Sequence, residues 1–488
     1  MWLLRVLTLC GTGDSYSHAT TIGMLPDIAL LEIFDLYRSS RNPSHIQWWS
    51  LLAHICRRWR QIVFSSPHRL NLQIRCTHGT PVEKYLGIWP AFPIVIDYHH
   101  AKPCKRPSDE NNIIAALKHP SRVSCVRLHE PDISAWRTEN VLATMQNPYP
   151  VLTHLDIYVD ETLPVLPADF LGGSAPRLQE ITLFGIPYPT LPTLLLSATD
   201  LVKLDLFNIP PTGYISPEAM IASLTALPKL ETLVIGFDLA TSRPNKKRRP
   251  PLTRTILPAL TSFRFKGASE YLEDLVARID CPRLNQIVIT YLNQVVDFQV
   301  TQFSNFIDRT VGPEIALFKH ARFTFAYRTV AFTVYPHAKH SPWDRRPATN
   351  IISCEGIDCQ VSHIAQVLGY MSAKLSNVIH LKLKVDQYGF HLKGTDDVEW
   401  MLLLNQFSTL QTLHVSRELA GYVALALEDI PAEMVDEVLP CLDMLCVAGQ
   451  PASSIEKFTT ARRLSGHPVT IVETETEFDE RIESYVSE

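Results

Sequence analysis

A short pattern of apolar residues recurs along most of the chain beyond residue 120. One apolar residue is followed by two others, a second apolar residue, one other and a third apolar residue. The pattern begins at Val123, Leu152, Leu178, Leu201, Leu230, Leu260, Leu284, Val378, Leu410 and Leu442. Successive starts lie 23 to 32 residues apart, apart from one interval of 94 residues. The alternating positions predict a strand, and stretches such as 218–227 and 361–375 predict helices between the strands. One strand and one helix per period indicate stacked repeats that share a core.

The long interval, between Leu284 and Val378, has room for about three further periods. Its sequence offers strand-like segments at 321–334 and 350–355. We expect this part of the repeat array to be irregular.

The chain begins its regular structure with two amphipathic helical stretches. Pro26 and Asp27 suit the first turn of a helix, and Leu30, Ile33, Phe34 and Tyr37 then follow at helical spacing. A second stretch places its apolar face at Trp48, Leu52, Ile55, Trp59 and Ile62. So few residues cannot bury so many large apolar side chains among themselves. The surplus must pack on the rest of the chain or on an external partner.

The motifs of these helices resemble an F-box, the short module that docks onto the Skp-type adaptor of cullin-RING ubiquitin ligases. The resemblance rests on Leu25-Pro26, Ile33-Phe34, Ile55-Cys56-Arg57-x-Trp59-Arg60 and Ser66-Pro67-x-x-Leu70. It covers about residues 24 to 72. The adaptor-binding residues that it implies are Leu25, Pro26, Leu30, Ile33, Phe34, Ile55, Cys56 and Trp59.

Residues 119 to 450 resemble leucine-rich repeats, although the asparagine expected three places after the last apolar residue is absent from every repeat. With the F-box, the chain looks like a divergent F-box/leucine-rich-repeat protein of the fungal kind. That resemblance implies a non-catalytic substrate receptor of an SCF-type ligase, with an adaptor and cullin complex and an unknown target protein as partners. The alternative is a repeat scaffold whose N-terminal helices only cap the solenoid.

The expected fold class is therefore α/β, with a helical F-box followed by an irregular leucine-rich-repeat solenoid, a curved parallel sheet with outer helices. The expected organisation is given by the following ranges: an unstructured leader at 1–23, the F-box at 24–72, a linker and the start of the solenoid at 73–118, the solenoid at 119–470 and an acidic tail at 471–488.

Composition narrows the possible functions. Hydrophobic residues make up 46% and charged residues 19%, so the chain can bury a large core. A net charge of −5 excludes a globally basic nucleic-acid binder, and no apolar run is long enough for a membrane helix. The ten cysteines include no Cys-x-x-Cys pair, which favours free thiols in a reducing compartment and neither a metal site nor a disulfide framework. We expect no cofactor, and a cytoplasmic or nuclear location.

Motifs of known catalytic sites are missing from the sequence. It contains no P-loop, no dinucleotide-binding glycine motif, no His-Glu-x-x-His and no Gly-x-Ser-x-Gly. We expect a protein that is not an enzyme.

One concentrated basic run occurs, at Lys246, Lys247, Arg248 and Arg249. It fits either a nuclear-import signal or a solvated loop between repeats. Because it follows the strand around Leu233, we expect it to be exposed in both cases.

A candidate binding surface emerges from the residues that alternate with the apolar ones. The position after the last apolar residue is Tyr158, Phe184 and Phe207 in three consecutive repeats, with Asp156 and Asp205 nearby. The same side of the sheet should carry Arg264, Lys266, Lys382 and Lys384. Regularly spaced aromatic residues among charges are typical of protein interfaces. The target is expected to contact Tyr158, Phe184, Phe207, Arg264 and Lys266. The alternative is that the apolar run 88–96 folds over these rings and buries them.

Overall fold

The computed structural model forms two compact units, Met1–Val95 and Ile96–Glu488, and the division between them falls within strand β2 (Ile94–Tyr98). It describes residues 22–40, 48–78, 80–98, 107–130, 138–159, 165–239, 253–292, 300–310, 319–335, 350–355, 360–371, 375–386, 397–428, 430–431, 434, 437–448 and 455–474.

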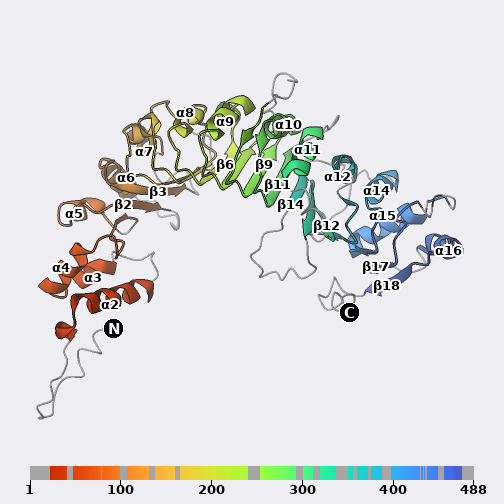
Figure 1. Cartoon of the computed structure of the whole chain (residues 1–488), viewed down its shortest axis with the longest axis horizontal. Helices are drawn as coiled ribbons and strands as arrows, with labels where there is room; N and C mark the ends of the chain where they lie inside the picture. The colour runs from red at the N-terminus through yellow and green to blue at the C-terminus, as the bar shows by residue number, and fades with distance from the viewer. Residues whose placement is uncertain are drawn as a thin grey trace, which may run out of the picture. The chain divides into compact units, whose positions relative to one another are not determined.

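The first unit consists mainly of short helices (Figure 1). Its elements before β2 are η1 (Ile22–Met24), α2 (Asp27–Ser40), α3 (Trp48–Ala53), α4 (Arg57–Ser65), β1 (Ile74–Cys76) and α5 (Val82–Leu86). The second amphipathic stretch is divided between α3 and α4. The Cys56 Sγ atom accepts a hydrogen bond from the Trp59 backbone N–H at 3.4 Å and so caps the start of α4.

Trp49 is the centre of the core of this unit. Its side chain is 1% exposed and makes edge contacts with the rings of Phe64, Trp89 and Phe92, at centroid distances of 6.1, 5.1 and 5.4 Å. Its indole N–H donates to the carbonyl oxygen of Gln73 at 3.1 Å. Residues 73–95, which the sequence pattern assigns to the linker and the start of the solenoid, therefore complete the core of the first unit.

The second unit contains the repeats. Its strands are β3 (Val123–Glu130), β4 (His154–Val159), β5 (Glu180–Phe184), β6 (Lys203–Ile209), β7 (Thr232–Phe237), β8 (Thr255–Ile256), β9 (Ser262–Gly267), β10 (Ile279–Asp280), β11 (Gln286–Leu292), β12 (His320–Ala326), β13 (Thr329–Tyr335), β14 (Asn350–Glu355), β15 (His380–Val385), β16 (Thr412–Val415), β17 (Met444–Ala448) and β18 (Thr470–Thr474). Its helices are α6 (Pro107–Leu117), α7 (Thr138–Ala143), η2 (Thr144–Gln146), η3 (Phe170–Gly173), α8 (Leu191–Leu195), η4 (Pro211–Gly213), α9 (Pro217–Leu224), α10 (Ser269–Val276), α11 (Thr301–Thr310), α12 (Gln360–Gly369), α14 (Asp397–Leu404), α15 (Arg417–Glu428) and α16 (Glu456–Leu464).

Apart from β8 and β10, which pair with each other in a separate two-stranded sheet, the strands of the second unit form one long, mostly parallel sheet. From β3 onward the order is β3-β4-β5-β6-β7-β9-β11-β14-β13-β12-β15-β16-β17-β18. The predicted parallel arrangement fails in the middle of this order, in the part of the array expected to be irregular. There β13 pairs antiparallel with both β12 and β14. The long interval between repeats holds this three-stranded insertion because β12 and β13 are joined by too few residues for the crossover that parallel strands need.

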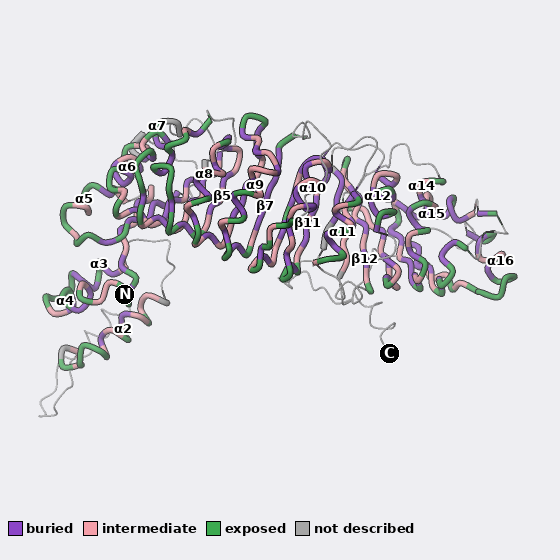
Figure 2. Tube along the Cα trace, turned by 45° about the horizontal axis from the view of Figure 1, so that its top comes forward, coloured by how far each residue is buried: buried purple, intermediate pink, exposed green. Residues whose placement is uncertain are grey.

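The second apolar residue of each repeat forms a continuous buried row across the parallel strands (Figure 2). From β3 to β11 these residues pair in register and are at most 1% exposed: Val126, Leu155, Ile181, Leu204, Leu233, Phe263 and Ile287. Leu381, Leu413 and Leu445 continue the pattern in β15 to β17. Burying each such side chain stabilises the fold by about 1.5–3 kcal/mol. The row holds the repeats in one register.

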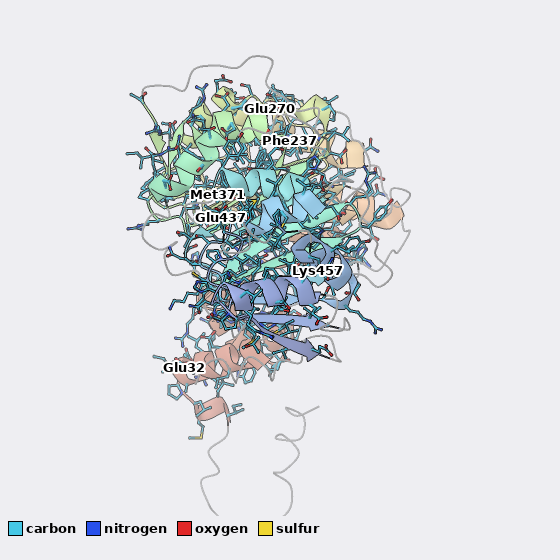
Figure 3. The ribbon with its side chains drawn as sticks, turned by 90° about the vertical axis from the view of Figure 1, so that its right-hand side faces the viewer. Glu32, Phe237, Glu270, Met371, Glu437 and Lys457 are labelled. Atoms are coloured by element: carbon cyan, nitrogen blue, oxygen red, sulfur yellow. The ribbon has the colours of Figure 1, made fainter. Side chains whose placement is uncertain are left out.

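Aromatic side chains fill the space between the sheet and a helix near the middle of the unit. Tyr271 on α10 contacts the ring of Phe237 on β7 at 4.7 Å and that of Phe265 on β9 at 5.8 Å. All three are nearly inaccessible to solvent, and Phe237 is labelled in Figure 3. The helix therefore covers one side of the sheet here.

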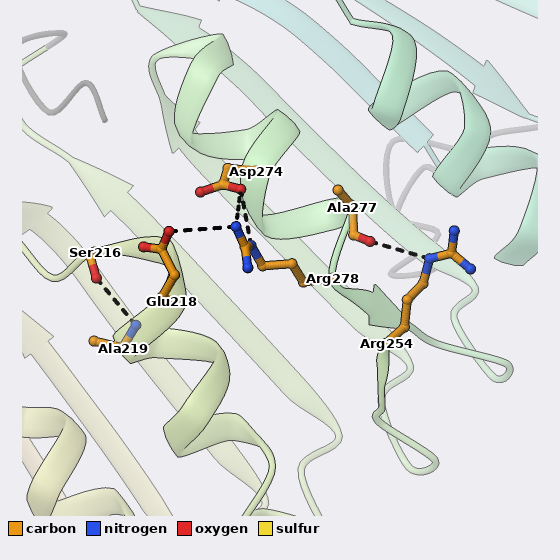
Figure 4. A network of polar contacts seen from close by, with 7 residues as sticks. All are labelled: Ser216, Glu218, Ala219, Arg254, Asp274, Ala277 and Arg278. Carbon is orange, nitrogen blue, oxygen red and sulfur yellow. Dashed lines mark hydrogen bonds and ion pairs between the residues drawn. The ribbon is translucent and has the colours of Figure 1, made fainter. Parts of the chain in front are cut away.

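Polar contacts join neighbouring repeats on the helix side (Figure 4). Arg278, directly after α10, pairs with Asp274 at 2.7 Å and with Glu218 of α9 at 3.5 Å. Ser216 caps α9 by accepting from the Ala219 N–H at 3.2 Å. Arg254 donates to the Ala277 carbonyl oxygen at 3.2 Å. Of these contacts, the Arg278–Glu218 pair links the end of α10 to α9.

Candidate functional site

The side of the sheet opposite the helices, here called the open face, carries the residues that alternate with the core. In β4, Leu155, Ile157 and Val159 are buried, whereas Asp156 and Tyr158 between them are partly exposed. The same alternation holds in β5, β9, β12 and β15. Because paired residues in a sheet point to the same side, the strand register assigns the open-face residues of every strand to rows.

Four rings form one such row on the open face, here called the aromatic row: His129, Tyr158, Phe184 and Phe207. Tyr158 and Phe184 stack at a centroid distance of 4.0 Å and an interplanar angle of 21°. His129 stacks on the other side of Tyr158 at 5.7 Å and 28°. Since stacked rings cover one another's faces, a partner approaching from solvent meets mainly their edges.

Charged side chains lie directly beside the aromatic row. Asp156 pairs with His129 at 2.9 Å between Oδ2 and Nε2, and Asp205 pairs with Lys203 at 2.8 Å between Oδ2 and Nζ. Thr182 separates the two carboxylates in the register. The pairs hold the charged groups in place between the rings and the start of the strands.

Asp205 is unusual because it is only 5% exposed although it lies on the open face. Burial raises its pKa above the usual range for an aspartate, against the opposing effect of the Lys203 hydrogen bond and charge and of Arg264. Arg264 itself is exposed and Lys266 is partly exposed, as expected for residues that face a partner. The structure thus brings predicted contact residues from β4, β5, β6 and β9 onto one surface.

The three predicted rings of the aromatic row are not fully buried. Tyr158, Phe184 and Phe207 all remain partly exposed. In the first unit, Phe92 and Ile94 of the apolar run 88–96 are buried, and Phe92 packs against Trp49. The alternative in which the three rings become buried core is therefore wrong.

His129 is a member of the aromatic row that the sequence pattern did not single out. It occupies the position after the last apolar residue of the first repeat, the same position as the three aromatic residues. The spacing could have identified it, but an imidazole was not counted with the rings. Its Nε2 atom contacts the Asp156 carboxylate on the neighbouring strand β4.

The residues implied by the F-box resemblance divide into two groups in the first unit. Leu30 and Phe34 are 0% exposed and Trp59 is 5% exposed, so these three support the surface from beneath and do not form it. Phe34 and Trp59 contact each other at a ring distance of 4.8 Å. Leu25 and Ile33 are partly exposed, and the remaining three, Pro26, Ile55 and Cys56, are exposed.

Arg58 joins two of the segments that carry the exposed residues. Arg58 on α4 donates to the carbonyl oxygen of Leu25 at 2.6 Å and pairs with Asp27 at 2.6 Å. This contact ties the first turn of α2 to the first turn of α4. Four large apolar side chains around these turns and α3 are strongly exposed, namely Met24, Ile28, Leu51 and Ile55, at 68%, 65%, 52% and 51%.

Three predicted segments lie wholly or mostly outside the described residues. They are the leader at 1–23, the basic run Lys246, Lys247, Arg248 and Arg249, and the acidic tail at 471–488. Within the described ranges, no group of three or more His, Cys, Asp and Glu side chains is arranged to hold a metal ion. No helix in the described part of the chain is both long and apolar enough to cross a membrane.

Comparison with known proteins finds similarity to a solved repeat-protein structure but no matching family model. No family model matches the chain, and no curated protein matches it. Among solved structures, the chain is similar to the leucine-rich repeat-containing protein LegL7 from Legionella pneumophila, with 13% sequence identity and a TM-score of 0.27. The match covers 75% of this chain and 97% of the other. The assignment of stacked strand and helix repeats rests on the register described above.

Proposed function

We propose that this protein is a non-catalytic substrate receptor of a cullin-RING ubiquitin ligase of the SCF type, located in the cytoplasm or the nucleus. In this proposal residues 24–72 bind a Skp-type adaptor, and the open face of the sheet captures a target protein. The coarser part of the proposal, a repeat protein that offers a surface for interaction, follows from the fold.

The observation that carries the adaptor proposal is the exposed apolar surface of the first unit. Its core is already filled by Leu30, Phe34, Trp49 and Trp59, yet Met24, Ile28, Leu51 and Ile55 remain more than half exposed. Arg58 keeps Ile28 and Ile55 at the same end of the unit by joining α2 to α4. Clustered apolar side chains on a rigid helical surface suit docking into a partner.

The proposal is tested by a pull-down of a purified Skp-type adaptor with the full chain. The double variant Ile28→Asp, Ile55→Asp should reduce adaptor recovery about tenfold or more, since apolar residues at an interface centre carry much of the binding energy. A second variant, Leu25→Ala with Pro26→Ala, tests the motif itself. The matched control is Ile88→Asp, because Ile88 is 71% exposed in the same unit but lies outside residues 24–72.

The control should bind the adaptor as the unchanged protein does, and all variants should keep the melting temperature of the unchanged chain. If the unchanged protein does not retain the adaptor, or if neither pair of substitutions lowers recovery, the ubiquitin-ligase role is wrong.

The second candidate is an interaction scaffold without a role in ubiquitination. It is favoured by the long sheet of the second unit, which offers a surface for interaction without any contribution from the first unit. Target binding by the open face without any adaptor binding would support this candidate.

A further inference from the structure

A second chemically distinct surface lies on the same open face, on strands β12, β15 and β16. It is here called the basic cluster and consists of His320, Arg322, His380, Lys382, Lys384 and His414. Arg322 pairs in register with Lys382, which pairs in turn with His414. His320 pairs with His380, two residues before Arg322 and Lys382 on the same strands. Six basic side chains from three neighbouring strands therefore face the same side.

The register shows that the basic cluster and the aromatic row share one surface. A single row of paired residues runs from Asp156 through Thr182, Asp205, Val234, Arg264, Val288, Ile351, Thr333 and Arg322 to Lys382. The row crosses the antiparallel insertion without changing side. A target bound on the open face could therefore contact both surfaces.

The balance of charge on these strands is strongly positive. The sequences of β12, β15 and β16 contain no Asp or Glu. Lys384 pairs with Asp386, just after β15, at 3.8 Å, and that carboxylate is 61% exposed. By contrast, the acids beside the aromatic row are paired at 2.8 and 2.9 Å. A long and exposed ion pair can be exchanged for an external anion at little cost.

Burial and neighbouring positive charges lower the pKa of two histidines in the cluster. The imidazoles of His320 and His380 stack at 4.6 Å with an interplanar angle of 14°. Burial and the Lys319 charge lower the pKa of His380, whereas burial, Lys382 and His380 lower the pKa of His414 to about 4. His414 is therefore neutral at physiological pH. The lysines and Arg322 supply the positive charge.

We propose that the basic cluster binds a short acidic segment of a target protein, an inference that rests on the proposed function because it specifies the target of the same open face. Arg322 and Lys382 lie on adjacent strands about 4.8 Å apart, and Lys384 follows two residues further along β15, so the three cations span about 10 Å. Three or four residues of extended chain have about that length. The guanidinium of Arg322 and the ammonium groups of Lys382 and Lys384 can then each meet an anionic group.

A nucleic acid fits these observations less well. The chain carries a net charge of −5, and the basic residues form a compact group on three strands. A nucleic-acid groove usually follows the phosphate backbone over a longer path. The anionic group itself could be a carboxylate or a phosphate ester, because both present oxygens to the same donors.

Binding of fluorescent peptides to the purified full chain tests the proposal without any adaptor. The probes are a hexaglutamate peptide, a phosphoserine peptide of equal charge and a hexalysine peptide, each measured by anisotropy at low and physiological salt. The chain should bind both acidic peptides and bind hexalysine at least about tenfold more weakly, and binding should weaken with salt. Preference for one acidic peptide identifies carboxylate or phosphate as the group recognised.

Charge-reversal variants locate the site. Lys382→Glu with Lys384→Glu should lower the affinity for the acidic peptides about tenfold or more. The control is Lys229→Glu with Lys457→Glu, which changes the net charge equally. Lys229 is paired with Asp200 away from the cluster, and Lys457 lies on α16 (Figure 3). The control should change affinity by less than about threefold, and both variants should keep the melting temperature of the unchanged chain.

Three results would overturn the inference: no acidic peptide bound, equal losses in both double variants, or tighter binding of a single-stranded oligonucleotide than of either acidic peptide. None of these depends on the Skp-type adaptor. A failure here would therefore leave the adaptor result intact, and loss of the adaptor function would not alter the peptide affinities.

Discussion

At the scale of single residues, the first unit depends on which of two adjacent tryptophans faces inward. Trp49 is 1% exposed, and its indole donates to Gln73, whereas Trp48 is partly exposed. The helical pattern of the sequence favours Trp48, because it lies four residues before Leu52. The rings that contact Trp49 come from α4 and from the segment after α5, so helical spacing cannot reveal them.

Replacing Trp49 with Ala should destabilise the first unit by about 3–5 kcal/mol, the usual cost of removing a large buried aromatic side chain. Trp48→Ala is the matched control and should cost less than about 1 kcal/mol. Chemical denaturation followed by circular dichroism measures both. Similar losses in the two variants would contradict the assignment of Trp49 as the centre of the core.

At the scale of elements, a half-buried carboxylate links two helices. Glu273 on α10 accepts hydrogen bonds from the backbone N–H groups of Gln302 and Phe303, at 2.7 and 2.8 Å. It thereby satisfies amides at the start of α11, which have no partner within the helix. Burial raises the pKa of Glu273 to about 7, and the two N–H donors oppose this effect. The junction between α10 and α11 is therefore sensitive to pH near neutrality.

Because the pKa of Glu273 is higher in the folded protein than in the unfolded chain, its stabilising contribution is complete below about pH 4.5 and is lost as the pH rises through about 7. Glu273→Gln removes the titration. The melting temperature of this variant relative to the unchanged protein should therefore rise from about pH 5 to about pH 8.

The control for this pH series is Glu270→Gln, which removes the same charge from the same helix but leaves the amides of α11 untouched (Figure 3). Its relative melting temperature should not follow the trend of Glu273→Gln. An opposite trend for Glu273→Gln would mean that the N–H donors outweigh burial and keep the carboxylate ionised.

At the scale of the whole second unit, the open face carries rings on its first strands and positive charge on β12 of the insertion and on the strands that follow it. The aromatic row spans β3 to β6, and the basic cluster spans β12, β15 and β16. Separate apolar and charged regions on one rigid surface favour a target that presents both an apolar group and an acidic segment. The helix side of the sheet supplies the rigidity, through contacts such as those of Arg278.

The double variant Phe184→Ala, Phe207→Ala should abolish target capture and leave adaptor binding intact. Both rings are partly exposed, so their removal should affect stability less than removal of a core ring. Quantitative mass spectrometry of proteins retained by the unchanged and the variant chain measures the loss. The control is Tyr327→Ala, because Tyr327 is 70% exposed between β12 and β13, away from the aromatic row. Retention of the same proteins by the double variant would exclude the aromatic row as the target surface.

The sequence by itself determined the repeats, because the spacing of apolar residues is a local property that each strand expresses independently. Every predicted strand pattern from Val123 to Leu442 lies at a strand of the sheet, and the position after it correctly identified Tyr158, Phe184 and Phe207 as open-face residues.

Only the tertiary structure decided how distant segments meet. The reversed order of β12, β13 and β14 depends on pairing between strands that the sequence spacing does not encode. It also brings His320 and Arg322 beside His380 and Lys382, so the basic cluster exists only in the folded chain. Ala321 holds the place that Leu381 holds in β15, so the apolar pattern was too weak to identify β12 as another repeat strand. Packing and register between strands, which depend on long-range contacts, supply what the local pattern lacks.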